Sequence, residues 1–160
     1  MRTKNPFATG AALLLGFALG APVALAQVPA IQTQDINQAG IVADLTEAKR
    51  SDGVLSVKIR LKNTGAKPEH VKIYESAPTR KTDAFYVQAE GKKYLPLRDS
   101  EKVALASAPD SYDGTLGPVI APGATFTWWA KYPAPPANLK KFSFYWPLGS
   151  PFDDVPITDK

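Results

Sequence analysis

The proline-rich connection Pro133-Ala-Pro-Pro-Ala-Asn138 lies between two aromatic runs, Pro122-Gly-Ala-Thr-Phe-Thr-Trp-Trp-Ala-Lys-Tyr132 and Lys141-Phe-Ser-Phe-Tyr-Trp146. Apolar and polar residues alternate in both runs, which is typical of half-buried β-strands. Because large rings dominate the energetics of a core, we expect the rest of the chain to pack around this pair of strands. The residues expected to face inward are Phe126, Trp128, Ala130 and Tyr132 in the first run, and Phe142, Phe144 and Trp146 in the second.

A further alternating stretch, Val54–Lys62, is the clearest single strand in the chain. Its inward positions are all apolar, and its outward positions are polar or basic. The dipeptide Asp52-Gly53 directly before it predicts a tight hairpin with a preceding strand at Ile41–Ala48. The residues expected to face inward are Leu55, Val57, Ile59 and Leu61.

Shorter strands follow the same pattern along the chain. Glu90-Gly-Lys-Lys93 predicts a hairpin from Ala84–Ala89 into Tyr94–Leu97, and Pro96 indicates that the second of these is an edge strand. No stretch has a convincing helical period. Seven to nine short strands separated by turn residues predict an all-β fold, a single antiparallel β-sandwich over residues 41–160. Further short strands are expected at His70–Tyr74, Val103–Ala106 and Pro151–Ile157.

The first 26 residues have the features of a secretory signal peptide. Arg2 and Lys4 form a basic start, an apolar centre follows at residues 11–19, and Ala24-Leu-Ala26 is a small-residue cleavage motif. The apolar centre is too short to span a bilayer, and no later run is long and apolar enough to do so. We therefore expect cleavage after Ala26 and a periplasmic or secreted protein. Residues 27–40 would then be a flexible lead-in or a short edge segment.

The composition of the remaining chain suits one domain with a single core. Without Arg2 and Lys4, the 19 basic residues become 17 against 15 acidic ones, so the formal net charge falls from +4 to +2. This small excess does not suggest nucleic-acid binding. The chain has no cysteine, so its stability must come from its aromatic and β-branched residues instead of disulfides.

Several turn and strand signatures occur together within Val42–Ile157. They are Asn63-Thr-Gly65, Gly91-Lys-Lys-Tyr-Leu-Pro-Leu-Arg-Asp99, Ala121-Pro-Gly123, Trp129-Ala-Lys-Tyr-Pro-Ala-Pro-Pro136 and Pro151-Phe-Asp-Asp-Val-Pro-Ile157. Combined, they resemble the immunoglobulin-like domains of unknown function in bacterial secreted proteins and lipoproteins, which sometimes sit beside an OmpA-type peptidoglycan-binding domain. The resemblance implies an immunoglobulin-like sandwich in the cell envelope and brings no catalytic residue, although this chain has no lipid-attachment cysteine.

The residue inventory argues against catalysis. His70 is the one histidine and there is no cysteine, whereas a zinc site needs several such ligands and a copper carrier needs Met, His or Cys. His70 would have to serve a Ser-His-Asp triad without any nucleophile-elbow motif, so we interpret it as a strand-end surface histidine. We expect no enzymatic activity, no metal and no cofactor.

Two pairs of carboxylates are candidate sites. Asp153 and Asp154 are neighbours, and neighbours in an extended segment point to opposite faces, so a solvated or strand-capping pair is the interpretation. Asp110 and Asp113 lie in the long loop from Ala108 to Gly117 and are candidate Ca²⁺ ligands. The loop lacks the dense Asp/Asn spacing of a dedicated site, so an ordinary Asp-rich turn is the alternative.

Lys58, Arg60 and Lys62 would form a basic stripe on the outward face of their strand. Such a stripe is a candidate surface for anionic envelope polymers or lipid head groups. The alternative is a solvated sheet face that discourages edge pairing and aggregation.

Trp129 and Tyr145 would point outward if Trp128 and Phe144 point inward. If the two aromatic runs pair antiparallel, the two outward rings lie opposite or nearly so, as a platform for a sugar ring or an apolar protein surface. The alternatives are a cross-strand pair that only stabilises the sheet, or a face covered by residues 27–40. Register decides between these cases, because a slip of one residue exchanges the two faces.

These observations predict a non-enzymatic, exported binding or accessory module that acts through protein–protein contacts in the cell envelope. A carbohydrate- or peptidoglycan-binding module that uses Trp129 and Tyr145 is the first alternative. A hydrolase with an unrecognised site is the second. The expected partner is accordingly an envelope protein or a glycan.

Overall fold

The structure is a computed structural model that describes residues 28–74, 81–108, 111–112 and 115–160. The predicted signal peptide and the two loop aspartates considered as Ca²⁺ ligands, Asp110 and Asp113, lie outside the described residues. The part of the chain that is described holds no helix long and apolar enough to cross a membrane.

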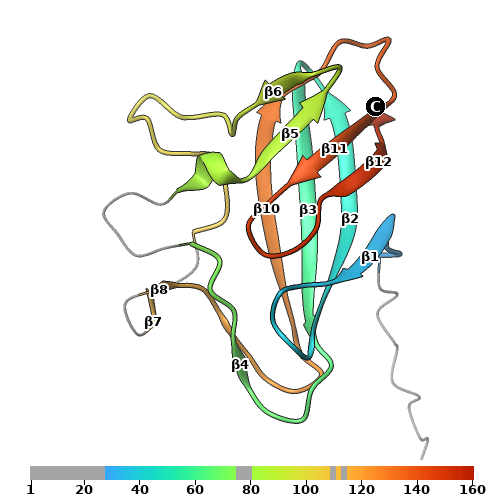
Figure 1. Cartoon of the computed structure of the whole chain (residues 1–160). Helices are drawn as coiled ribbons and strands as arrows, with labels where there is room; N and C mark the ends of the chain where they lie inside the picture. Colours follow the sequence, from blue (N-terminus) through green and yellow to red (C-terminus); the bar gives the residue numbers. More distant parts are fainter. Residues whose placement is uncertain (1–27, 75–80, 109–110, 113–114) are drawn as a thin grey trace, which may run out of the picture.

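Two β-sheets form the body of the protein, which confirms the predicted all-β fold. In Figure 1, the long strands β2, β3 and β10 run side by side and the strands of the second sheet cross in front of them. The five-stranded sheet has the order β1 (Gln32–Asp35), β2 (Ile41–Ser51), β3 (Val54–Asn63) and β10 (Thr125–Pro133), with β13 (Thr158–Asp159) parallel to β2. The four-stranded sheet has the order β12 (Phe152–Pro156), β11 (Lys141–Tyr145), β5 (Tyr86–Ala89) and β6 (Lys92–Tyr94).

Short elements complete the described part of the fold. Two-stranded pairs join β4 (Glu69–His70) to β9 (Val119–Ile120) and β7 (Ser111–Tyr112) to β8 (Thr115–Leu116). A single 3₁₀ turn, Thr82–Ala84, precedes β5. Strand β6 lies at a sheet edge, as Pro96 indicated, although it ends at Tyr94 before the proline.

The core lies between the inner faces of the two sheets. The ring centroids of Trp128 and Phe144, from opposite sheets, are 5.7 Å apart, and those of Tyr132 and Phe144 are 6.3 Å apart. The Tyr132 hydroxyl donates to the Phe85 carbonyl at 3.2 Å, so its polar end is satisfied inside the core. The predicted inward face of β3 is confirmed, because Leu55, Val57, Ile59 and Leu61 are all fully buried.

The expected pairing of the two aromatic runs is wrong. Strand β10 pairs with β3, whereas β11 pairs with β5 and β12 in the other sheet. The connection between them contains Pro133, Pro135 and Pro136, which have no amide hydrogen and do not form the ladder of a tight hairpin. The two runs therefore cross from one sheet to the other and meet face to face through their inward rings.

The hairpin between β2 and β3 was predicted correctly and contains one irregularity. Asp52 and Gly53 have φ values of 51° and 76°, the left-handed conformation that a two-residue type I′ turn requires. A β-bulge lies between Leu45 and Glu47. An extra residue on one strand reverses the alternation beyond it, so Arg50 points to the inner side and is buried.

The buried Arg50 guanidinium holds the crossover between β10 and β11. It donates to the carbonyl oxygens of Pro135, Pro136, Ala137 and Leu139 at 2.7–3.1 Å. Its Nε also donates to Asp159 Oδ1 at 2.6 Å. One charged side chain thus joins β2, the crossover and the C-terminal strand β13.

Residues 32–35 are an edge strand, so the expectation of a flexible lead-in over residues 27–40 is wrong for this part and the alternative of a short edge segment is correct. Strand β1 pairs antiparallel with β2. The Gln32 and Gln34 side-chain amides donate to the carbonyls of Asp153 and Ser150, each at 2.7 Å. These bonds tie the N-terminal strand to the other sheet, which the polar sequence alone did not indicate.

The Arg50 network predicts a large cost for Arg50→Met, which keeps the apolar stem and removes the donors. We expect the free energy of unfolding to fall by about 3 kcal/mol, because buried carbonyls lose their partners. Urea unfolding followed by tryptophan fluorescence measures the change. The matched control is Arg98→Met, whose ion pair with Asp83 is exposed (43% and 53%) and should contribute less than about 1 kcal/mol. Equal losses in the two variants would contradict the assigned role.

The Asp159 carboxyl predicts a dependence of stability on acid. Hydrogen bonds from Arg50 and Lys140 lower its pKa from 3.8 to about 2. A lowered folded-state pKa stabilises the fold above the unfolded value, and this contribution is lost as the pH falls through about 4 to 2. The stability difference between the wild type and Asp159→Asn should therefore be full at pH 7 and shrink toward pH 2.

Urea titrations at several pH values between these limits measure that difference. Asp154→Asn is the control, because its carboxylate is 81% exposed and lies 3.6 Å from Lys141. We expect a much smaller effect from it. A difference between wild type and Asp159→Asn that did not change with pH would count against the ion pair as its source.

Candidate functional site

An open hollow lies on the outer face of the five-stranded sheet. Cross-strand register places Glu47 on β2, Lys58 on β3 and Trp129 on β10 in one row across this face. The volume of the hollow is about 390 Å³. We call it the Trp129 hollow; its lining residues are Glu47, Ser56, Val57, Lys58, Trp129, Ala130 and Lys131.

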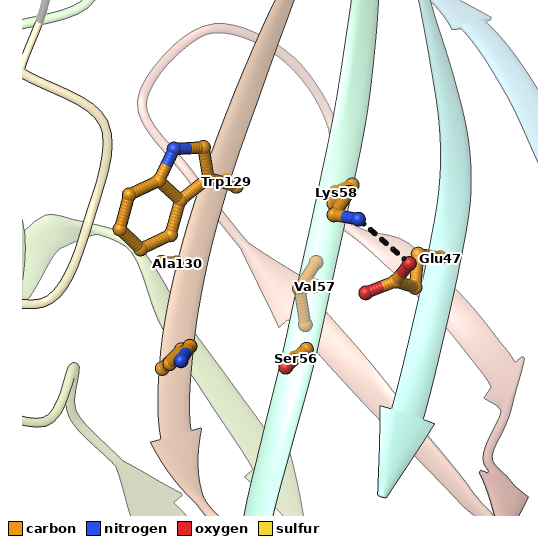
Figure 2. A pocket seen from close by; sticks show the side chains of 7 residues that line it. Glu47, Ser56, Val57, Lys58, Trp129 and Ala130 are labelled. Carbon is orange, nitrogen blue, oxygen red and sulfur yellow. Dashed lines mark hydrogen bonds and ion pairs between the residues drawn. The ribbon is translucent and has the colours of Figure 1, made fainter.

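Trp129 is the exposed aromatic residue of this hollow. Figure 2 shows its indole lying broadside next to the β10 ribbon, with the Lys58–Glu47 ion pair on the neighbouring strands. The residue is 39% exposed. Among the side chains that the structure describes, no aromatic ring or ammonium group stacks on the indole. Part of one large apolar ring is therefore open to solvent.

Ser107 forms hydrogen bonds with the backbone of Trp129 on the edge of β10 that does not pair with β3. The Trp129 amide donates to Ser107 Oγ at 2.8 Å, and the Ser107 amide donates to the Trp129 carbonyl at 2.8 Å. The Ser107 carbonyl accepts from the Tyr74 hydroxyl, which in turn accepts from the Trp128 indole at 2.8 Å. A hydrogen-bonded chain thus runs from the buried Trp128 indole to the backbone of Trp129, and the strand positions the exposed ring.

The basic stripe on β3 is largely neutralised. Lys58 Nζ lies 2.9 Å from Glu47 Oε2. Arg60 donates two hydrogen bonds to Asp44 Oδ2, at 2.7 and 3.1 Å, and one to the Val28 carbonyl at 3.0 Å. Among the described residues, Lys62 is the member of the predicted stripe that forms no ion pair. The face therefore presents ion pairs at two of the three positions instead of a row of free cations.

The Asp44 carboxyl illustrates how firmly these charges are held. Burial raises its pKa, but hydrogen bonds from Thr33 and Arg60 and the positive charge of Arg60 outweigh burial, so the net pKa lies below its usual value. Thr33 lies on the edge strand β1 and donates to Asp44 at 2.7 Å. Asp44 thus stays ionised and keeps the Arg60 guanidinium in place.

Tyr145 does not lie near Trp129, because it is on β11 in the other sheet. Its ring stacks on Tyr86 with centroids 4.8 Å apart and planes 5° apart. The Lys93 ammonium lies 3.7 Å from the Tyr86 ring centroid. An ammonium and a parallel ring do not fit on the same face at these distances, so both faces of Tyr86 are covered. Tyr145 thus forms a cross-strand aromatic pair with Tyr86, and neither the expected platform nor the alternative pair of Trp129 with Tyr145 exists.

The remaining candidates lie apart from this hollow. His70 is at the end of a two-residue strand, paired with Val119. Asp153 and Asp154 are both exposed at a bulge opposite β11. Within the described residues, no group of three or more His, Cys, Asp or Glu side chains gathers where a metal could bind.

Local sequence pattern does not reveal several residues of this face. Glu47 reaches the outer face only because the bulge after Leu45 shifts the alternation. Ser107 comes from a loop whose pairing with the edge of β10 leaves no local sequence signal. The alternating pattern of β3 and β10 did indicate that Ser56 and Lys131 point outward.

No protein-family model, no curated protein and no solved structure matches this chain. The resemblance to immunoglobulin-like envelope domains therefore stays a prediction, and function is inferred from the geometry of the site.

The exposure of the three tryptophans predicts a simple fluorescence result. Trp128 and Trp146 are 2% and 6% exposed, against 39% for Trp129. Iodide should therefore quench chiefly Trp129, and Trp129→Phe should remove most of the quenchable emission. Stern–Volmer plots of the wild type, Trp129→Phe and the control Trp146→Phe measure this. Quenching that survives in Trp129→Phe would show that the ring is not the accessible one.

Proposed function

We propose that this protein is a non-enzymatic, exported binding module that holds a saccharide on the outer face of its five-stranded sheet. The observation that carries the proposal is the exposed indole of Trp129, which lies in an open hollow and is anchored through its backbone. The signal-like first 26 residues support a role outside the cytoplasm.

The chemistry of the Trp129 hollow matches that of a sugar ring. A pyranose has a face of C–H groups and a rim of hydroxyls. The indole covers the C–H face, while the fixed Lys58 ammonium and Glu47 carboxylate donate to and accept from hydroxyls. The open shape of the hollow suits one unit of a longer chain.

A protein partner on the same face is the other occupant that the sequence suggests. A stable protein interface buries about 800 Å² on each side and is usually anchored by several large side chains. Trp129 is the only aromatic residue among the exposed large hydrophobic residues of the described chain. The other four are Val28, Leu95, Val103 and Val119. A single exposed ring among charged groups favours the saccharide.

The proposal predicts that purified protein sediments with an insoluble glycan. We expect residues 27–160 to pellet with peptidoglycan sacculi or with chitin or cellulose, and Trp129→Ala to lose at least about tenfold in affinity. The matched control is Tyr145→Ala, which removes an aromatic ring from the other sheet and should bind as the wild type does. Failure to pellet with all three glycans would exclude the proposal. A protein partner captured by the wild type and not by Trp129→Ala would then indicate a protein ligand.

A further inference from the structure

Two lysines flank a serine in the row next to Trp129. Cross-strand register places Lys49 on β2, Ser56 on β3 and Lys131 on β10 side by side on the outer face. Strand spacing puts the Cα atoms of the two lysines about 10 Å apart. Ser56 and Lys131 line the Trp129 hollow. Two flexible ammonium groups can thus converge above one hydroxyl.

The charges of this row differ from those of the next two outward rows along β3, those of Lys58 and Arg60. Arg60 is paired with Asp44 and Lys58 with Glu47, so each of those rows carries no net charge. Within the described ranges, neither Lys49 nor Lys131 has a carboxylate within ion-pair distance. Lys49 and Lys131 therefore place two unneutralised positive charges in the row next to the exposed indole, where a ligand would meet them, whereas Lys62 lies at the other end of β3.

We infer that the saccharide is acidic: its carboxylate binds between Lys49 and Lys131, with Ser56 as a hydroxyl donor, while a sugar ring stacks on Trp129. Residues 129 and 131 point to the same side of β10 and lie about 7 Å apart along the strand. A carboxylate on the stacked sugar or on the next unit spans that distance. Glu47 limits where the acid can bind, because its own negative charge lies in the row of the indole.

This inference rests on the proposed function. The experiment is therefore designed to distinguish failure of the acidic-ligand inference from failure of the saccharide proposal. The probes are polygalacturonate, alginate and hyaluronate oligosaccharides. Each is compared with its carboxyl-reduced form, in which the carboxylates have become primary alcohols, and with neutral chitin oligosaccharides. We expect wild-type protein to bind at least one acidic form about tenfold more tightly than its reduced form at low salt. This preference should shrink as ionic strength rises from roughly 50 to 500 mM.

The variants assign the preference to the two lysines. Lys49→Gln/Lys131→Gln should abolish the preference for the acidic form while Trp129-dependent binding of the reduced form stays. Lys62→Gln/Lys67→Gln removes the same charge from exposed positions outside the row and should keep the preference. Circular dichroism and urea unfolding confirm that both double variants fold.

The outcomes distinguish the acidic ligand, its assignment to the Lys49–Ser56–Lys131 row and the saccharide proposal from one another. Equal binding of acidic and reduced forms, or of neutral chitin alone, overturns the acidic ligand and leaves the saccharide proposal standing. A preference that survives Lys49→Gln/Lys131→Gln overturns the assignment to this row. A preference lost equally in both double variants shows general charge attraction instead of a site. Absence of binding to any of these glycans overturns the inference, and together with negative sedimentation it overturns the proposed function.

Discussion

The arrangement of the two sheets depends on the hydrogen bonds that the Arg50 guanidinium donates to the crossover between β10 and β11. The crossover from β10 to β11 is rich in proline, so it has few amides to pair with its own carbonyls. Arg50 supplies donors to four of these carbonyls and reaches Asp159 as well. With the crossover held, the aromatic faces of β10 and β11 meet across the core as opposite walls. Arg50 reaches this position only because the bulge in β2 turns it inward.

The proposed binding face depends on the same scaffold. Trp128 and Trp129 are adjacent, so the strand that buries one ring exposes the other. The loop residue Ser107 pairs with the edge of β10 and connects through Tyr74 to the buried indole. A ring presented on a rigid strand loses little conformational entropy on binding, which favours recognition by a small, open surface. The ion pairs beside it fix polar groups at known positions without making the whole face basic.

Much of the fold could be predicted from local pattern. Alternation identified the buried positions of β3, β10 and β11, and the Asp52-Gly53 dipeptide identified the first hairpin. The actual partners of β10 and β11 could not be predicted, because alternation says which residues are buried and does not say which strand lies alongside. For the site, alternation places Trp129 on the outward face of its strand, but the same pattern with an assumed hairpin places Tyr145 beside it, which is wrong. The partners of Lys58 and Arg60 lie on another strand, so the basic stripe looked more charged than it is.

By itself, the sequence determined the all-β class, the inward faces of the main strands and the placement of Trp128 and Trp129 on opposite faces of one strand, since side chains on a strand alternate whatever the strand pairs with. Only the tertiary structure decided which strands share a sheet, which cations are neutralised and which lysines remain together beside Trp129. These properties depend on cross-strand register. A one-residue bulge changes that register for every residue beyond it, and a proline-rich crossover sends the next strand to the opposite sheet.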